Sequence, residues 1–293
     1  MKEQFKYHFG KFFKKFILIK ENLQTEFYIR FLNKELKNII ISNRKNLDNI
    51  GTIFTENEFQ ENDYGMDKEI FSHINKKIKN YPTYSDLIVY TSSFLENRNI
   101  NYLEIGVSVL KNFMQVNNQF NSSHLVAYDI NPPTHKFLKL FKKEQEKLYT
   151  SNHKNKITYF QGSVLDIKDT EEFKSIFKEK FDIVFSDALH TPQGIESEYK
   201  HIISGSLQSD FILYFDDLDF PGIQEAVSKI YLDLQKSYSK LFFTTFKVYG
   251  WVGQNEKMHR NGIISTLNFY NIFKTNNVKL PSLKLEKNSN SKL

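Results

Sequence analysis

The residues with the clearest chemical potential are three aspartates and a histidine in the second half of the chain. Asp187 and His190 follow one short apolar run, and Asp216 and Asp217 follow the next. If the two runs are neighbouring parallel strands, their carboxyl ends lie about 5 Å apart, so the carboxylates share one crevice. Carboxylates this close repel one another and raise each other's pKa. A hard divalent ion relieves the repulsion, and Mg²⁺ favours carboxylate oxygens.

This set predicts metal-assisted chemistry on a hydroxyl group. A cation bound by Asp187, Asp216 and Asp217 would stabilise a developing alkoxide or phenolate, and its free positions could take two neighbouring hydroxyl oxygens. His190 is close enough to Asp187 in sequence to accept the hydroxyl proton near neutral pH, which makes it the predicted catalytic residue. Two plainer readings stay open. The aspartate pair could cap a helix ahead of Pro221, and the histidine could bond a loop at a helix start.

A second set of residues has the order expected of a nucleotide-type cofactor site. Glu104 and Gly106 end one apolar run, and Asp129 ends the next, 25 residues after Glu104. An acidic residue about 20 positions on is where a ribose diol is held by two hydrogen bonds. A carboxylate at position 104 can hold the amino group of a bound amino acid, while Gly106 lets the backbone approach it. Gly162 and Ser163 follow the third run and could border an adenine ring.

These residues require a parallel sheet to bring them together. Between residues 101 and 267, apolar runs alternate with segments of helical character, and the runs span residues 102–106, 125–129, 157–160, 181–185 and 211–215. This alternation predicts an α/β fold, a mainly parallel sheet with helices on both faces. Residues 241–249 and 262–267 predict an antiparallel pair, because only a turn-rich stretch separates them. In such sheets the ligand binds beyond the carboxyl ends of the strands.

The strand ends resemble the successive motifs of class I S-adenosylmethionine-dependent methyltransferases. The matching segments are Tyr102–Gly106, Ala127–Asp129, Gln161–Ser163 and Phe181–Asp187, and the resemblance covers about residues 101–267. It implies a Rossmann-like sheet of five parallel strands plus an antiparallel hairpin, with S-adenosylmethionine as cofactor.

The resemblance also implies individual roles for the cofactor-binding residues. Glu104 and Gly106 would lie near the methionine moiety, Asp129 on the ribose, Gly162 and Ser163 beside the adenine, and Asp187 beside both cofactor and metal. One departure is the first loop, where the family usually has two or three glycines. Here Gly106 is followed by residues 107–110, which are Val, Ser, Val and Leu. The departure keeps open a methyltransferase-like binding or scaffold module.

The acid–histidine set resembles the metal-dependent sugar O-methyltransferases of the macrocin and mycinamicin type and, more distantly, catechol O-methyltransferase. The matching stretches are Asp187–Ile195 and Asp216–Val227. The resemblance implies Mg²⁺ on Asp187, Asp216 and Asp217, His190 as base, and O-methylation of a sugar or other small vicinal diol. Methyl transfer to protein or nucleic acid is the alternative. The stretch Tyr249–Arg260, which holds the one Trp, could contact a sugar or aryl acceptor.

Pattern and composition divide the chain into three regions. Residues 1–98 predict a helical N-terminal extension, with helices over about residues 5–27, 66–79 and 85–96, acting as a lid or dimer element. Residues 99–280 form the predicted cofactor-binding domain. Residues 281–293 are rich in Lys, Asn and Ser, and predict a disordered tail.

Composition excludes several classes of function. The chain has no cysteine, which excludes disulfides, thiolate zinc sites and cysteine nucleophiles. No apolar run approaches the roughly 20 residues that cross a bilayer, so we expect a soluble, cytoplasmic protein. The formal charge of +6 is modest and arises near the N-terminus, so we expect no nucleic-acid partner, while the small-molecule acceptor is what the resemblance implies. The basic N-terminal helix leaves membrane-surface contact and a homo-oligomer open.

Overall fold

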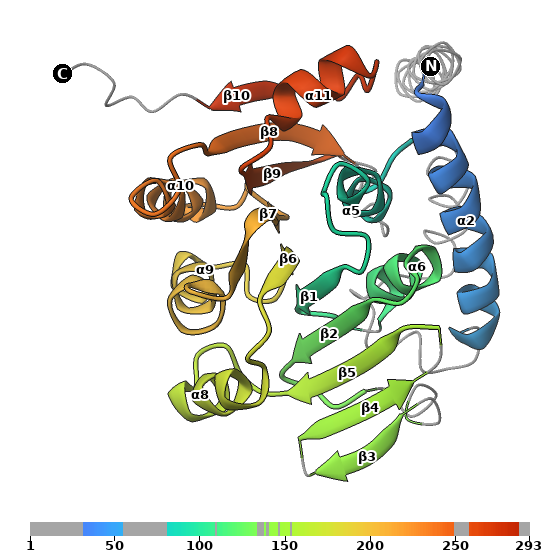
Figure 1. Ribbon diagram of the computed structural model, residues 1–293, viewed down its shortest axis with the longest axis vertical. Helices are drawn as coiled ribbons and strands as arrows, with labels where there is room; N and C mark the ends of the chain where they lie inside the picture. The colour runs from blue at the N-terminus through green and yellow to red at the C-terminus, as the bar shows by residue number, and fades with distance from the viewer. Residues whose placement is uncertain are drawn as a thin grey trace, which may run out of the picture.

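The computed structural model describes residues 32–54, 81–108, 110–133, 138, 141–145, 147–152, 154–248 and 258–286. Their strands form one sheet in the order β10-β8-β9-β7-β6-β1-β2-β5-β4-β3 (Figure 1). The strands are β1 (Asn101–Ile105), β2 (His124–Asp129), β3 (Lys142–Gln145), β4 (Leu148–Asn152), β5 (Lys156–Gln161), β6 (Phe181–Ser186), β7 (Leu207–Phe215), β8 (Phe242–Val248), β9 (His259–Ser265) and β10 (Lys284–Glu286).

The centre of the sheet confirms the predicted fold class. Strands β5, β2, β1, β6 and β7 are parallel neighbours. Strand β9 then pairs antiparallel with β7, and β8 pairs antiparallel with β9. Five parallel strands followed by an antiparallel pair are the Rossmann-like arrangement expected from the sequence. The inner strands are largely apolar and buried because helices cover both of their faces.

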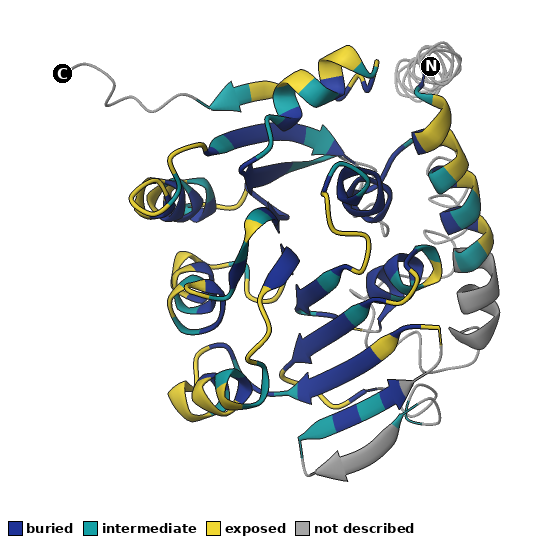
Figure 2. Cartoon of the chain, in the orientation of Figure 1, coloured by how far each residue is buried: buried dark blue, intermediate teal, exposed yellow. Residues whose placement is uncertain are grey.

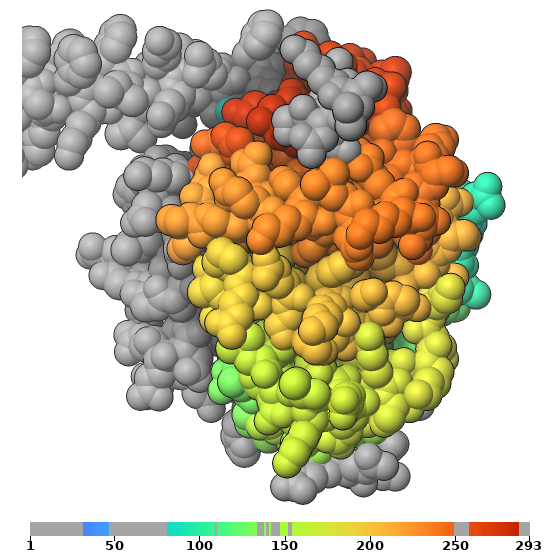
Figure 3. Space-filling view, turned by 90° about the vertical axis from the view of Figure 1, so that its left-hand side faces the viewer, coloured from blue at the N-terminus to red at the C-terminus, as the bar shows by residue number. Residues whose placement is uncertain are grey.

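Helices form a layer on each side of the sheet. The helices α8 (Ile167–Ile176), α9 (Pro192–Glu198) and α10 (Ile223–Leu234) line one side in Figure 1, and Figure 3 views this layer face-on. The helices α2 (Lys34–Phe54), α5 (Tyr84–Ser92) and α6 (Lys111–Gln119) lie on the other side. Successive strand residues point to opposite faces, so Tyr102 joins the core under α5 and α6 while Leu103 joins the core under α8–α10. Figure 2 shows both buried layers.

The C-terminal segment corrects one prediction. Residues 281–293 were expected to be a disordered tail, yet β10 pairs antiparallel with β8, with Leu285 opposite Thr244. Thr245 Oγ1 also donates a hydrogen bond of 2.9 Å to Glu286 Oε1. Without β10 the strand β8 would expose an unpaired edge, which a protein benefits from covering. Composition does not reveal such pairing. Residues 287–293 lie outside the described part of the chain.

The described part of the N-terminal region packs against the sheet. The predicted helices over residues 5–27 and 66–79 lie outside the described residues, and the one predicted at 85–96 corresponds to α5. Helix α2, which the pattern did not predict, contacts α5 and α6. A buried ion pair joins α2 to α5, with Arg44 Nη2 2.6 Å from Asp86 Oδ2. The role as lid or dimer element stays a prediction.

Two further features complete the fold. The antiparallel hairpin β3–β4 extends the sheet beyond β5, and no pattern in the sequence predicted it. A π-helical turn, η1 (Tyr199–Ile203), continues α9. Of the described helices, none combines the length and the apolar character that crossing a membrane requires.

Candidate active site

The loop after β1 approaches the end of β6 so closely that only glycine fits. Gly106 has φ +86°, and a Cβ placed on it would lie 2.3 Å from the backbone oxygen of Asp187. Two backbone hydrogen bonds of 2.8 Å fix this crossing: Gly106 N to Tyr128 O, and Asp187 N to Ile105 O. The predicted glycine is therefore needed to bring the strand ends together, besides lining the pocket.

The rest of this loop adopts glycine-like conformations without glycine. Ser108 has φ 45° and Leu110 has φ 64°, so alternate residues of the loop lie in the left-handed region. Each such residue costs roughly 1–2 kcal/mol. Asp129 Oδ2 offsets this by accepting 2.9 Å hydrogen bonds from Val107 N and Ser108 N. The departure from the glycine-rich pattern therefore leaves the backbone turn in place.

A pocket of about 400 Å³ lies beyond the carboxyl ends of the parallel strands. Five of the six residues predicted to bind cofactor line it together: Gly106, Asp129, Gly162, Ser163 and Asp187. Its remaining lining residues are Ser108, Tyr128, Ile130, Asn131, Val164, Leu165, Ala188 and Leu189. Ile130, Leu165 and Leu189 are exposed apolar side chains at this opening, which suits a flat, weakly polar ring.

Asp129 is already bound to the backbone around it. Its Oδ2 accepts the two loop hydrogen bonds, and its Oδ1 accepts one of 2.9 Å from Asn131 N. An ionised carboxylate offers about four acceptor positions. Three of these positions are taken, so one acceptor position remains, on Oδ1. Asp129 could therefore accept one hydrogen bond from a ribose diol, where two were expected.

The turn after β5 is held from two sides. Gly162 N donates to Asp129 O at 2.8 Å, and a Cβ on Gly162 would lie 2.7 Å from Phe160. Ser163 N donates to Asp169 Oδ2 at 2.8 Å, and Ser163 O accepts from Tyr128 Oη at 3.0 Å. These contacts fix the backbone of the turn at the side of the pocket.

Glu104 lies deeper than expected, beneath the pocket and outside its lining. The residue is 1% exposed, and its Oε2 accepts hydrogen bonds from Tyr102 Oη at 2.6 Å and Asn112 Nδ2 at 2.8 Å. Burial raises the pKa of this carboxyl well above its usual range, and the charges of Asp187 and Asp129 add to the rise. The side chain points to the face covered by α6 because Glu104 and Tyr102 are two residues apart on β1.

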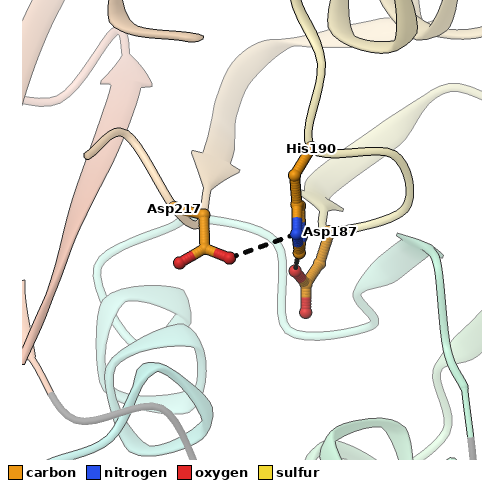
Figure 4. A group of neighbouring side chains, drawn as sticks. All are labelled: Asp187, His190 and Asp217. Atoms are coloured by element: carbon orange, nitrogen blue, oxygen red, sulfur yellow. Dashed lines mark hydrogen bonds and ion pairs between the residues drawn. The ribbon is translucent and has the colours of Figure 1, made fainter. Parts of the chain in front are cut away.

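Three of the four residues predicted as metal ligands or base, Asp187, His190 and Asp217, form one group at the ends of β6 and β7. His190 lies between two carboxylates, with Nε2 3.0 Å from Asp187 Oδ1 and Nδ1 3.3 Å from Asp217 Oδ2 (Figure 4). Asp217 has φ 53°, a left-handed conformation that aspartate tolerates better than most residues. These three side chains lie close enough to offer ligands to one ion.

A second histidine, which the sequence did not single out, completes the other side of the cluster. His259 Nδ1 lies 2.5 Å from Asp217 Oδ1, and Asp216, Asp217 and His259 form a second group with metal-ligand spacing. Asn261 Nδ2 donates a hydrogen bond to Asp216 Oδ1. Both residues come from β9, which lies beside β7. We call Asp187, His190, Asp216, Asp217 and His259 the acid–histidine cluster.

The electrostatics of the cluster are those of crowded charges. Burial raises the pKa of Asp187, and burial with the charge of Asp187 raises that of Asp216 well above its usual range. Burial alone would lower the pKa of His190, but the carboxylates of Asp187 and Asp217 outweigh it and raise the value to about 9. The hydrogen bond to Asp217 raises the pKa of His259. Without a bound cation, His190 is therefore an imidazolium at neutral pH.

The structure excludes helix capping by the aspartate pair and leaves the plainer interpretation of His190 open. The N-cap of α10 is Gly222, so neither Asp216 nor Asp217 caps that helix. The N-cap of α9 is Thr191, and His190 just before it directs its ring to carboxylates. The nearby Asp219 is separate from the cluster, because it accepts from Arg260 N at 2.9 Å and lies 3.7 Å from Lys247 Nζ.

Comparison with known proteins gives distant structural neighbours. No protein-family profile and no curated protein matches this sequence. The structure is similar to an O-methyltransferase from Bacillus cereus in complex with SAH (11% identity, 71% of this chain and 94% of that chain, TM-score 0.44). It is also similar to the O-methyltransferase TomG from Streptomyces achromogenes in complex with SAM (13% identity, 72% of this chain and 95% of that chain, TM-score 0.43). A third neighbour is spermidine synthase from Thermotoga maritima (13% identity, 64% of this chain and 61% of that chain, TM-score 0.40). Similarity this distant carries no argument about function, which must be argued from the site.

Proposed function

We propose that this protein is an S-adenosylmethionine-dependent O-methyltransferase that uses a divalent cation, Mg²⁺, and acts on a hydroxyl of a small vicinal diol such as a sugar. One observation carries the proposal. Asp187 lines the 400 Å³ pocket and also belongs to the acid–histidine cluster, so a nucleoside pocket and a cation-binding group of side chains adjoin.

The pocket fits the nucleoside half of the cofactor. Asp129 Oδ1 would accept one ribose hydroxyl, and the turn at Gly162 and Ser163 would border the adenine between the apolar side chains of Ile130 and Leu165. S-adenosylmethionine supplies a methyl group on a sulfonium. The residues of the chain bind and orient the two reactants, which is most of what such a transfer requires.

The acid–histidine cluster fits a divalent cation. Asp187, Asp216 and Asp217 supply the hard carboxylate oxygens that Mg²⁺ prefers, and His259 is an added ligand or hydrogen-bond partner of Asp217. A bound cation would relieve the repulsion that, in addition to burial, raises the pKa of Asp187 and Asp216, and would stabilise an acceptor alkoxide. The balance of the reaction is simple: the C–S bond breaks as the C–O bond forms, and the hydroxyl proton passes to a base.

His190 is the first candidate for that base. Its raised pKa comes from the same carboxylates that we assign to the cation, so cation binding and the basicity of His190 are linked. His259 is the second candidate, because within the described residues only one of its ring nitrogens contacts a carboxylate. Replacing each histidine by Gln separates the two, since only loss of the base should remove the acidic limb of the pH–rate profile, on which activity rises as the base loses its proton.

A methyl-transfer assay tests the proposal. The protein is incubated with S-adenosylmethionine labelled on the methyl group and a panel of sugars and catechols, with Mg²⁺ or with excess chelator. We expect label in an O-methyl product only with Mg²⁺ present. Full activity in excess chelator would refute the metal role, and failure to bind S-adenosylmethionine at all would refute the cofactor.

The main reason for the scaffold alternative no longer holds. It depended on the glycine-poor first loop, and Ser108 and Leu110 hold that loop in the left-handed conformations glycine would adopt. The same assay tests for methyl transfer to protein or nucleic acid when a polypeptide or RNA replaces the panel of diols.

A further inference from the structure

We infer that Asn112 is a cofactor-binding residue, whose side-chain oxygen accepts a hydrogen bond from the ammonium group of the cofactor's amino acid arm. The inference rests on the proposed function, since it supposes a cofactor that carries an amino acid. It adds to Glu104 a second acceptor that the sequence motifs do not assign.

Among the described residues, the amide oxygen of Asn112 has no hydrogen-bond partner. Asn112 lies in the first turn of α6 and is 4% exposed. Its Nδ2 donates to Glu104 Oε2 at 2.8 Å and reaches Tyr102 Oη at 3.2 Å, which fixes the orientation of the amide. Its Oδ1 is buried and accepts no hydrogen bond from the described residues. A buried acceptor that receives no hydrogen bond is costly and rare in folded proteins.

Glu104 offers a second free acceptor beside it. Both hydrogen bonds that the described part of the chain donates to Glu104 end on Oε2, and none ends on Oε1. Two acceptors, one of them able to carry a negative charge, therefore belong to side chains that are hydrogen-bonded to each other. An ammonium group has three donors and a positive charge, so it satisfies both at once. Glu104 belongs to neither of the described groups of side chains with metal-ligand spacing.

The position suits the amino acid arm. Glu104 is near enough to Asp129, on the nucleoside side, and to Asp187, on the reaction side, for both charges to raise its pKa. Gly106, two residues further on, lines the pocket itself. A ligand whose adenosine occupies the pocket and whose sulfur faces the acid–histidine cluster would therefore extend its amino acid toward Glu104 and Asn112.

The test compares two ligands that differ only in the ammonium group. Calorimetry measures the affinities of S-adenosylhomocysteine and its desamino analogue for the wild type, for Asn112→Ala and for the control Gln115→Ala. Gln115 is buried one turn further along α6, and its Oε1 is equally unpartnered among the described residues. It bonds Ser85 and the Lys111 backbone, away from Glu104, so its loss should affect packing alone.

We expect Asn112→Ala to weaken S-adenosylhomocysteine binding about 10- to 100-fold, the range of a hydrogen bond to a charged group. The desamino analogue should bind the variant as it binds the wild type. Gln115→Ala should leave the affinity ratio of the two ligands unchanged. Equal weakening of both ligands by Asn112→Ala, or no weakening of either, would overturn the inference.

Two outcomes separate this inference from the proposed function. If the wild type binds S-adenosylhomocysteine tightly but does not prefer it to the desamino analogue, the ammonium site is wrong and the cofactor pocket stands. If the wild type binds neither ligand, both are wrong. If Asn112→Ala does not fold, Asn112→Leu, which keeps the side-chain volume and removes the acceptor, takes its place in the same comparison.

Discussion

The cofactor pocket and the acid–histidine cluster share Asp187 but are built on opposite electrostatic principles. In the pocket, the acidic side chain is satisfied by the protein: Asp129 accepts three backbone N–H groups. In the cluster, Asp187, Asp216 and Asp217 crowd one another and rely on two imidazoles for compensation. The pocket is complete as it stands, whereas the cluster is suited to receive positive charge.

This difference suits each region to a different class of ligand. A preformed pocket with satisfied polar groups holds a ligand by shape and a few directed hydrogen bonds. A cluster of buried carboxylates holds a cation because the ion relieves repulsion that the fold has imposed. Altering the two regions separately should therefore have separable effects on cation and cofactor binding.

The largest expected effect on ligand binding comes from Asp217→Asn, because both halves of the cluster use this residue. Loss of residues that merely orient metal ligands costs about 10- to 100-fold in affinity, so loss of a shared ligand should cost at least about 100-fold. Calorimetry with Mn²⁺ measures this, and S-adenosylhomocysteine affinity should not change. The control is Asp219→Asn, which removes a nearby carboxylate paired with Arg260 and Lys247. Wild-type Mn²⁺ affinity in Asp217→Asn would contradict the account.

Gly106→Ala should damage both regions at once. Its Cβ would overlap the Asp187 backbone at 2.3 Å, and its φ of +86° is strained for alanine. We expect a loss of about 4 kcal/mol in the free energy of unfolding. The matched control is Gly205→Ala, where φ is +79° and nothing lies within 4 Å, so only about 1 kcal/mol should be lost. Equal losses in the two variants, measured by denaturant unfolding, would show that the close approach does not matter.

Glu198 provides a pH test of the electrostatics behind the cluster. This carboxyl is fully buried on α9, Ser186 Oγ donates to its Oε2 at 2.5 Å, and burial together with the charge of Asp187 raises its pKa to about 8. Because the folded pKa exceeds the unfolded value near 4.5, the folded state keeps a proton that the unfolded state loses. Stability from that proton is present below about pH 4.5 and is lost as pH rises toward 8.

Glu198→Gln should therefore become more stable relative to the wild type as pH rises from 5 to 8. The expected gain is on the order of 3 kcal/mol. Denaturant unfolding of both proteins in chelator at several pH values measures it. A difference that is constant with pH, or that falls, would mean that Glu198 is already ionised at pH 5.

The smallest effect concerns the first loop. Ser108→Gly removes the left-handed strain at φ 45° and adds the entropy cost of glycine, so the net gain should be about 0.5 kcal/mol. S-adenosylhomocysteine affinity should stay the same, since Asp129 bonds the backbone at this position. A loss of stability or of affinity would show that the serine side chain is needed.

Much of the fold and of the site could be predicted because both follow from local patterns joined by one topological rule. Apolar runs fixed the parallel strands, and the rule that strand ends meet at one edge placed Asp187 near Asp216 and Asp217. The depth of Glu104 was not predictable in the same way. It depends on the face of β1 to which the side chain points and on the hydrogen bonds that Tyr102 and Asn112 donate on that face.

The features that were missed depend on contacts distant in sequence. His259 reaches Asp217 across 42 residues and from a different strand, so no spacing rule connects them. Strand β10 and the hairpin β3–β4 pair at opposite sides of the sheet, where tertiary context decides. Helix α2 is held by the buried Arg44–Asp86 pair, whose partners lie on separate helices.

One measurement tests the central claim most directly: a crystal structure of the wild type grown with S-adenosylhomocysteine and Mn²⁺. The anomalous signal of manganese locates the ion without ambiguity. The account predicts one peak among Asp187, Asp216 and Asp217, with adenosine density in the pocket lined by Asp129 and Gly162. A structure with adenosine bound elsewhere, or with no manganese at these aspartates, would contradict it.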